Sequence, residues 1–593
     1  MRHFLLTIAG VFAGLMLFAI IAPIMLVGAV ALATRPAPLA ARSVLVLDLR
    51  GALVDQDIQA PIAIFSGHGQ SVMGIEETLR RARGDGAVRG LLVRLPEGGV
   101  NPAAADELRL AFKAFRAAGK PILAVSQGLY AQGPVTSTYE LAAASGDIWM
   151  QPGSAFQVTG FSRQDIFFKR FFDHHQIQPD FQQRYEYKNA VNPYLFDGYT
   201  PAHREGELSW MGSVYATSLA AAAIDRSRPL ADLKSAIEAG PWSAGEAVAK
   251  GLIDHAGGVR EAQNAILAKA GPGAALVSFD NYAARRRGGG PSLSGGQAIA
   301  VISGEGDIMT GGGGVGSPFG GGPTIRSDDI ARAFDRATRD PDVKAIVFRI
   351  SSPGGSDTAS EQILTAVRAA RAAGKPVVVS MGAYGASGGY WIASQASEIV
   401  AQPGTLTGSI GVFGGKFAFG PALAQFGVDM DGLKVGGDYA DALSSRAPMT
   451  PTQRAAFSAW MDRIYQGFIG RVAAGRRLPV ARVEEIAKGR VWTGAQARDL
   501  GLVDSLGGFP QAVERAKALA GIRGLARLES FNIETSPIQA LRRMFGTGAQ
   551  GVRAAAAALD FTTDPRAEAL LGSLRDARLR ANGATVLAPR AGW

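Results

Sequence analysis

The chain has 593 residues, and its 61 Lys and Arg against 51 Asp and Glu give a formal net charge of +10 without a long basic run. This charge favours solubility and attraction to anionic lipid over nucleic-acid binding. With 47% hydrophobic residues and no cysteine, the composition excludes disorder throughout, disulfides, cysteine-ligated metal sites and thiol nucleophiles.

The amino-terminal segment is predicted to anchor the chain in a membrane. Residues 4–34 carry no charge, and about 20 apolar residues suffice to cross a bilayer as a helix. A secretory apolar region is shorter, about 7–15 residues, so an uncleaved signal anchor is favoured, although residues 31–33 leave cleavage open as an alternative. Arg35 and Arg42 offset Arg2, so loop charge barely decides the orientation, and we expect the long remainder to be exported.

Two long segments of the chain repeat one another. The string Arg-Ala-Ala-Gly-Lys-Pro at 116–121 recurs unchanged at 371–376, an offset of 255. Further matches keep the same order while the offset drifts only to 250: 44–47 with 299–302, 90–95 with 345–350, 151–153 with 402–404, 242–245 with 492–495, and 251–254 with 501–504. Chance does not produce such a series, so the chain is a tandem duplication.

The duplication divides the chain into five predicted parts. These are a signal anchor at 1–41, a first repeat at 42–284, a basic Gly-rich linker at 285–297, a second repeat at 298–528 and an Ala/Arg-rich extension at 529–593. The extension has no counterpart in the repeat, and its amphipathic stretches predict helix. Glycine-rich segments at 311–314 and 320–322 lack the Lys-Ser/Thr of a phosphate-binding loop, so they predict an exposed mobile loop.

Within each repeat, apolar runs alternate with helical patterns. In the second repeat we expect a buried strand at 343–350, then an amphipathic helix at 360–373 that ends at Gly374. A second strand at 376–380 and a second helix at 388–397 follow. This alternation is typical of α/β units with parallel strands.

Small residues surround Ser387 at the junction of the second strand and helix. They would let a substrate backbone approach, and a helix N-terminus favours developing negative charge. The alternative is a tight turn in which Ser387 caps the helix. The pattern G-x-S-x-G at 385–389 also matches the nucleophile elbow of α/β-hydrolases, but no histidine follows Ser387, which excludes their usual order. His174 or His175 of the first repeat stays open as a partner in space.

A serine without an imidazole partner needs another base, and lysine fills this role in known Ser-Lys pairs. Such a lysine acts only when neutral, so burial must lower its pKa. The candidate is Lys188, which lies among tyrosines and small residues at 185–194. Glu186 counts against it, because the two side chains would share one face of an extended segment and the carboxylate would favour the ammonium. The alternative is a solvated surface lysine.

The alignment of the two repeats supports a shared site. Lys188 falls opposite Ala440, so the second repeat lacks this lysine. Ser387 falls opposite Gly133, or opposite Gln132 after a one-residue shift, so the first repeat lacks the serine. Because each repeat retains one half of the pair, we predict a composite site formed by both.

Several motifs resemble peptidase family S49, in the long, duplicated form of its signal peptide peptidases. They are ASGGYW at 386–391, TLTGSIG at 405–411, VWTG at 491–494, GLVD at 501–504 and YKNAV at 187–191. The likeness covers residues 42–526. It implies an α/β fold, a tandem duplication of a ClpP/crotonase-like ββα-repeat domain preceded by one N-terminal transmembrane helix.

The resemblance also implies roles for particular residues. Ser387 would be the nucleophile, Lys188 the general base, and Ser409 the residue that orients the lysine amine. Backbone N–H groups of Gly354, Gly355 and Gly388 would form the oxyanion hole. The resemblance implies neither a metal nor a cofactor. Asn189, the long glycine loop and the extension depart from the family pattern, but none of them removes a catalytic position.

The implied activity is that of a membrane-anchored serine endopeptidase that degrades signal-peptide remnants and other extended apolar peptides after export. The implied setting is the bacterial inner membrane, crossed once, with a homotetramer whose catalytic domains lie on the periplasmic side. Two alternatives stay open at this point. One is a crotonase-like acyl-CoA enzyme, since that superfamily shares the oxyanion architecture. The other is a catalytically silent membrane scaffold.

Overall fold

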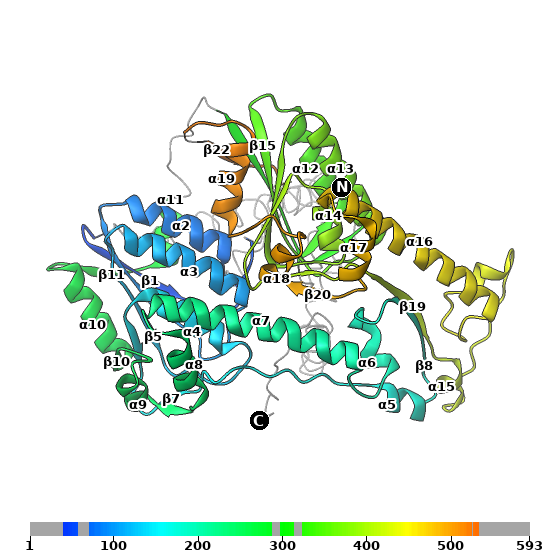
Figure 1. The fold of residues 1–593 in the computed structure, drawn as a ribbon, viewed down its shortest axis with the longest axis horizontal. Helices are drawn as coiled ribbons and strands as arrows, with labels where there is room; N and C mark the ends of the chain where they lie inside the picture. Colours follow the sequence, from blue (N-terminus) through cyan, green and yellow to red (C-terminus); the bar gives the residue numbers. More distant parts are fainter. Residues whose placement is uncertain (1–39, 57–69, 287–296, 313–322, 525, 533–593) are drawn as a thin grey trace, which may run out of the picture.

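A computed structural model of the chain describes residues 40–56, 70–286, 297–312, 323–524 and 526–532 (Figure 1). The predicted membrane helix lies outside these residues, as do most of the linker, residues 313–322 of the glycine-rich loop and the extension from residue 533. Within the described ranges, no helix is both long and apolar enough to cross a bilayer.

The first repeat folds around a six-stranded sheet whose described pairings are all parallel. Along the sheet its strands are β10 (His255–Ala256), β6 (Ile148–Met150), β5 (Ile122–Ser126), β4 (Val88–Arg94), β1 (Ser43–Asp48) and β11 (Ala275–Ser278). Successive strand residues point to opposite faces. Leu91 and Val93 enter the core on one face, and Leu92 enters a second core on the other. The central strands β4 and β5 are buried on both faces, which explains their continuous apolar runs at 91–93 and 122–125.

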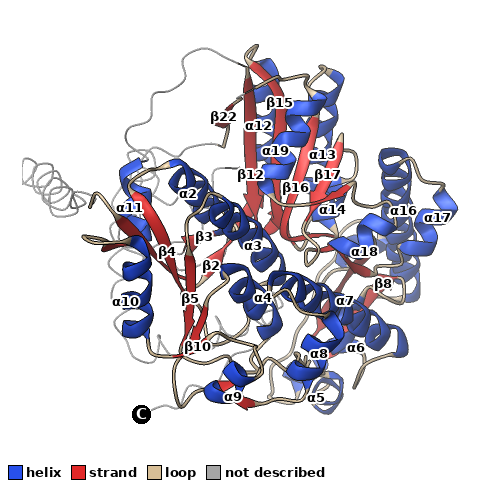
Figure 2. Cartoon of the chain, turned by 60° about the vertical axis from the view of Figure 1, so that its left-hand side comes forward, coloured by secondary structure: helices blue, strands red, loops and turns tan. Residues whose placement is uncertain are grey.

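Helices cover the two faces of this sheet. α2 (Val72–Gly84), α3 (Pro102–Ala117) and α4 (Val135–Ser145) lie on one face, and α10 (Val259–Ala270) lies on the other (Figure 2). α3 begins at Pro102 because the side chain of Asn101 accepts a hydrogen bond from the Ala103 N–H at 3.0 Å and caps the helix. α3 carries two buried carboxylates, Asp106 and Glu107, which contact the second repeat.

The second repeat forms a larger sheet with the same parallel core. Its order is β20 (Val491–Thr493), β18 (Leu406–Gly408), β16 (Val377–Ala386), β15 (Val343–Ser352), β12 (Ala298–Glu305) and β22 (Arg527–Ser530), with β17 (Glu398–Ala401) beside β16 and β21 (Ser505–Leu506) beside β17. β20 runs antiparallel to β18. The sheet continues through Ser530, two residues beyond the boundary expected from the sequence.

In the second repeat, as in the first, helices cover both faces of the sheet. α12 (Ser327–Arg339), α13 (Asp357–Ala372) and α14 (Gly388–Ala393) share one core with the sheet, and α19 (Phe509–Leu519) forms another on the opposite face. The protein is therefore a mixed α/β fold built from two similar halves. The ClpP/crotonase-like assignment stays a prediction.

Two connections bring the halves together. β8 (Gln178–Arg184) of the first repeat pairs antiparallel with β19 (Val412–Ala418) of the second, and α16 (Pro451–Arg476) packs against this two-stranded ribbon. α7 (Pro201–Asp225) contacts both α4 and β20, and it lies beneath the second sheet in Figure 1. The ribbon carries the chain that follows β8, including Lys188, into the second repeat.

The remaining elements are short. They are β2 (Leu53–Val54), β3 (Gln70–Ser71), β7 (Ala155–Phe156), β9 (Trp242–Ser243), β13 (Asp307–Met309), β14 (Thr324–Arg326), α5 (Lys169–His174), α6 (Asn192–Leu195), α8 (Leu230–Glu238), α9 (Ala244–Ala249), α11 (Phe279–Arg286), α15 (Gly420–Ala424), α17 (Val480–Ile486), α18 (Gly494–Asp499) and the 3-10 turns η1 (Asn189–Val191) and η2 (Asp438–Asp441).

The elements predicted around Ser387 are present with shifted ends. The strand predicted at 343–350 continues to Ser352, and the strand predicted at 376–380 continues to Ala386. The helix predicted at 360–373 begins earlier, at Asp357, because the Ser356 hydroxyl accepts a hydrogen bond from the Ala359 N–H at 3.2 Å. The helix predicted at 388–397 ends at Ala393.

Equivalent residues of the two repeats make equivalent hydrogen bonds. Lys120 Nζ donates to two carbonyl groups at the end of α2, and Lys375 Nζ donates to two at the end of α12. The hydroxyls of Tyr139 and Tyr390 each donate to the main-chain oxygen of a leucine at 2.8 Å. These shared contacts define which residues are equivalent in space.

Counting back from the two tyrosines changes the residue paired with Ser387. The position opposite it is Thr136, whereas the sequence alignment placed Gly133 there. The alignment was displaced because the first repeat has three more residues between Tyr130 and Tyr139 than the second has in the corresponding segment. Thr136 is buried inside α4, so the first repeat presents no exposed hydroxyl at this point.

Candidate active site

Ser387 lies at the junction of β16 and α14. Its φ and ψ of 53° and −119° place it in a backbone region that costs about 1–3 kcal/mol for a residue with a side chain. Its N–H donates to the Gly408 oxygen at 2.9 Å, which ties the junction to β18. Ser387 occupies the cap position of α14, but its side chain makes no capping hydrogen bond. The capping alternative is therefore wrong for the hydroxyl.

Lys188 reaches this hydroxyl from the other repeat. The residue precedes η1, is 4% exposed, and its Nζ lies 3.0 Å from Ser387 Oγ. The same Nζ lies 2.9 Å from Ser409 Oγ and 3.0 Å from the main-chain oxygen of Ser409. Three residues singled out in the sequence thus meet within one chain, although 199 positions separate Lys188 from Ser387.

Burial controls the charge of Lys188. Desolvation of the ammonium lowers the pKa of Lys188 to about 7, so half of the amines are neutral near that pH. The carboxylate of Glu186 does not oppose this effect, because it lies 3.2 Å from Lys488 Nζ at the surface. The surface-lysine alternative is therefore wrong, and the concern raised by Glu186 is answered by a partner from the second repeat.

Ser409 follows β18 in a left-handed conformation, with φ of 49°. Its N–H donates to the main-chain oxygen of Arg490 at 2.7 Å, which fixes the backbone on the far side from Lys188. This bond ties down the Ser409 backbone, which carries one of the two oxygens that Lys188 Nζ contacts. The Ser409 Oγ and main-chain oxygen can therefore accept two hydrogen bonds from the Lys188 amine.

The N–H groups of Gly355 and Gly388 lie beside Ser387 and have no hydrogen-bond partner among the described residues. They are neighbours, since a Cβ built on Gly388 would lie 3.1 Å from the Gly355 nitrogen. Gly354 differs from the expectation, because its N–H already donates to Ser352 Oγ at 3.2 Å. Gly354 supplies space instead: a Cβ there would lie 2.8 Å from the Ser387 Cβ. Of the three N–H donors expected for the oxyanion hole, only those of Gly355 and Gly388 are available.

Arg490 holds the turn that carries Lys188, and the sequence analysis missed it. Its guanidinium stacks on Tyr187 and Trp492, 4.9 and 4.2 Å from their ring centres. The same group lies 2.7 Å from Glu205 of α7. No local motif marks this arginine, because its partners come from both repeats. The only signal in the sequence is its place beside the VWTG motif.

The histidines considered as partners lie elsewhere. His174 and His175 meet edge to face at the end of α5, and His175 packs on Phe171. Among the described residues, Lys188 is the one hydrogen-bonding partner of Ser387 Oγ. The same part of the chain contains no group of three or more His, Asp and Glu side chains arranged for a metal ion.

Comparisons with known proteins show which family the chain resembles. The model of peptidase family S49 matches residues 114–271 and 369–523, one match in each repeat. Protease 4 of Salmonella typhi is 34% identical over 513 residues, which cover 82% of this chain and 79% of the relative. Protease 4 of Haemophilus influenzae is 29% identical over 519 residues, covering 84% of this chain and 82% of the relative. Among solved structures, a mutant of the 1510-N membrane-bound stomatin-specific protease covers 41% of this chain and all of its own, at 15% identity and a TM-score of 0.26.

Proposed function

Because the chain belongs to peptidase family S49 and is a serine peptidase, we propose that Ser387 and Lys188 form its catalytic dyad. The observation that carries this proposal is the 3.0 Å approach of a buried lysine Nζ to an uncapped serine Oγ. Ser409 supports the neutral form of Lys188. A neutral amine has two N–H donors and one lone pair, so two bonds to Ser409 leave the lone pair for Ser387.

The reaction follows from these contacts. Neutral Lys188 takes the proton of Ser387 as Oγ attacks the peptide carbonyl, and the C–O bond forms while the carbonyl becomes an oxyanion. The N–H groups of Gly355 and Gly388 bind that oxyanion, and such a donor contributes about 2.7–4 kcal/mol in well-studied enzymes. The lysine ammonium then protonates the leaving amine as the C–N bond breaks. Water, activated by the same lysine, hydrolyses the acyl-enzyme.

We further propose the substrate and the cellular setting. The substrates are signal-peptide remnants and other extended apolar peptides, which reach the enzyme after export. The uncharged segment at 4–34 supports attachment to the bacterial inner membrane by one helix, with the catalytic repeats on the periplasmic side. The assembled form is a homotetramer, as the resemblance to the family implies.

A covalent serine-directed phosphonate, followed by mass-spectrometric mapping, tests the dyad. We expect the adduct on Ser387 in the wild type, none in Ser387→Ala, and much slower labelling in Lys188→Ala at pH 8. Ser444→Ala, which changes an exposed serine of the second repeat, should label as the wild type does. Labelling at an unchanged rate in Lys188→Ala would contradict the role of the lysine. An adduct on another serine would contradict the nucleophile.

A further inference from the structure

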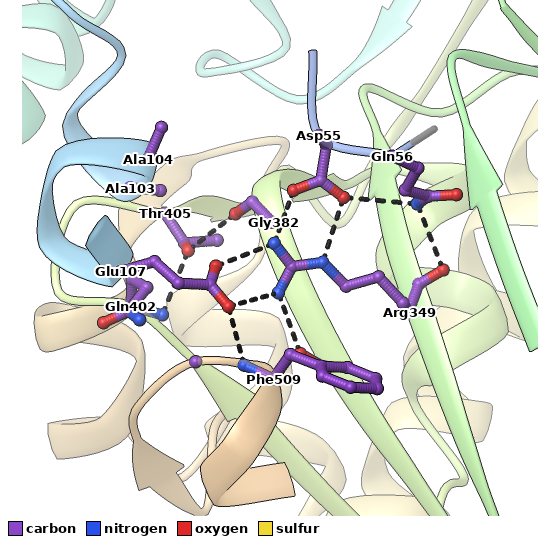
Figure 3. A network of polar contacts seen from close by, with 12 residues as sticks. Asp55, Gln56, Ala103, Ala104, Glu107, Arg349, Gly382, Gln402, Thr405 and Phe509 are labelled. Atoms are coloured by element: carbon purple, nitrogen blue, oxygen red, sulfur yellow. Dashed lines mark hydrogen bonds and ion pairs between the residues drawn. The ribbon is translucent and has the colours of Figure 1, made fainter. Parts of the chain in front are cut away.

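A buried ion cluster joins the two repeats around the side chain of Arg349 (Figure 3). Arg349 Nε lies 2.9 Å from Asp55 Oδ2, and Nη2 lies 2.7 Å from Glu107 Oε2 and also contacts Asp55 Oδ1. Nη1 lies 3.2 Å from Glu107 Oε1 and 2.9 Å from Ser380 Oγ. All five N–H donors of the guanidinium therefore have an acceptor. The side chains of Arg349 and Glu107 are each 1% exposed.

Acids outnumber the guanidinium in this cluster. Asp55 and Glu107 come from the first repeat and face the single positive charge of Arg349. Burial, with the nearby Glu107 charge, raises the pKa of Glu76 well above its usual range. A buried charge is costly unless it is paired and hydrogen-bonded, and the two first-repeat carboxylates accept four of the five guanidinium hydrogen bonds. The guanidinium therefore requires both of them in place.

Carboxylates of α3 also hold the main chain of the second repeat. Asp106 Oδ2 accepts a hydrogen bond from the Gly404 N–H at 2.7 Å, and Glu107 Oε1 accepts one from the Phe509 N–H at 2.7 Å. Both approaches need glycine in the second repeat. A Cβ on Gly404 would lie 3.0 Å from Asp106 Oδ2, and one on Gly508 would lie 2.6 Å from Glu107 Oε1. The two surfaces are therefore shaped to fit one another closely.

The second-repeat members of this boundary lie on segments that lead to the site. Arg349 stands on β15, which runs directly into the glycine loop with the free N–H. Ser380 stands on β16, which ends one residue before Ser387. Gly404 precedes β18, which ends one residue before Ser409. The first-repeat members belong to the unit that supplies Lys188, so a shift at this boundary would change the distance between Nζ and Oγ.

The duplication provides an internal comparison. Arg94 occupies the position of Arg349 in the first repeat, at the end of β4. Its side chain is 23% exposed and lies 3.0 Å from Gln127 of its own repeat. Within the described parts of the chain, the arginine at this place in the fold thus binds acids of the other repeat only in the second copy.

We propose that Arg349 is a positioning residue: its cluster sets the alignment of the two repeats at which Lys188 Nζ reaches Ser387 Oγ. This inference rests on the proposed Ser-Lys function. Arg349 touches neither the nucleophile nor the base, and it acts through the β15 loop, β16 and β18. Lysine cannot replace it, because an ammonium has three donors on one atom and cannot make the five hydrogen bonds that the guanidinium makes to Asp55, Glu107 and Ser380.

The test compares Arg349→Lys with Arg94→Lys in the full-length protein, using an apolar peptide substrate and the phosphonate. A misplacement near 1 Å lowers turnover about 100-fold, so we expect kcat of Arg349→Lys to fall by roughly that factor with little change in KM. The midpoint of the pH profile of kcat/KM should also shift to higher pH, since misaligned repeats admit water to Lys188. Arg94→Lys should match the wild type in both measurements.

A merely structural role gives a different pattern. Loss of folded protein lowers activity equally at every pH and leaves the midpoint in place, so a proportional loss that follows the folded fraction would overturn the proposal. Wild-type kcat and midpoint in folded Arg349→Lys would overturn it as well. If Arg349→Lys does not fold, Glu107→Gln takes its place under the same criteria, because its amide would set an N–H against the guanidinium.

The parent proposal is tested separately. If Ser387→Ala and Lys188→Ala are inactive while Arg349→Lys behaves as the wild type, only the positioning role fails. If either Ser387→Ala or Lys188→Ala retains activity, the proposed dyad fails whatever Arg349→Lys does.

Discussion

The carboxylate of Glu186 lies 3.2 Å from the Lys488 amine, so the acid two residues from Lys188 is paired with a lysine of the other repeat. Both partners are close to half exposed, and their pairing leaves the buried amine of Lys188 without an opposing charge. The charge state of the proposed base therefore depends on contacts between the two repeats.

The first prediction concerns the pH dependence of cleavage. Because burial lowers the pKa of Lys188 to about 7, kcat/KM should rise with pH through a midpoint near 7 and level off above it. Glu186→Gln should leave this midpoint in place, since Glu186 bonds Lys488 rather than Lys188. Pre-steady-state acylation rates between pH 5.5 and 9 would measure it; a fall of the midpoint in Glu186→Gln would show that the two side chains interact.

The second concerns stability. The folded protein binds fewer protons than the unfolded chain between pH 7 and 10.5, because the pKa of Lys188 is lowered only in the folded state. Lys188→Met should therefore have a larger free energy of unfolding than the wild type. The difference should be largest at pH 7 and below, where the wild-type ammonium is buried. This pH-dependent margin, on the order of a few kcal/mol, should vanish towards pH 10.5. Urea unfolding at several pH values gives the margin, with Lys234→Met at an exposed site as the control.

The third concerns Ser409. Ser409→Ala removes one of the two oxygens that hold the Lys188 amine but keeps the main-chain oxygen at 3.0 Å. Loss of one hydrogen bond of about 1–2 kcal/mol predicts a fall in kcat of roughly 5–30-fold with KM nearly constant. Single-turnover kinetics separate this from substrate binding. A change confined to KM would assign Ser409 to the substrate instead of the lysine.

The fourth concerns Gly354. Its φ is +120°, and a Cβ there would lie 2.8 Å from the Ser387 Cβ and 2.9 Å from the Gly388 nitrogen. Gly354→Ala should abolish phosphonate labelling because it displaces both nucleophile and oxyanion donor. Gly374→Ala introduces similar backbone strain, with φ of +81°, but its Cβ would meet no atom within 4 Å. That variant should lose stability and still label Ser387; equal loss of labelling in both would assign the effect to strain.

Much of the fold was visible in the sequence. The string at 116–121 and its copy at 371–376 indicated the duplication. The alternating apolar runs predicted parallel strands between helices, and the structure has them. The strand and helix ends were less certain, because a single capping residue such as Ser356 moved a helix start by three positions. The counterpart of Ser387 was misplaced, since three extra residues in the first repeat could be located only by the shared contacts of Tyr139 and Tyr390.

By itself, the sequence determined that two diverged copies exist and that one retains Lys188 while the other retains Ser387, because these facts reside in residue identity and order. Only the tertiary structure decided that the amine is buried, that Glu186 turns to Lys488, and that the N–H groups of Gly355 and Gly388 lack an acceptor among the described residues. It alone placed Arg349 between two carboxylates of the other repeat, where Arg94 stays near the surface. The reason is physical: desolvation and hydrogen-bond partnership depend on which distant atoms exclude water from a group, and neighbours in sequence do not specify those atoms.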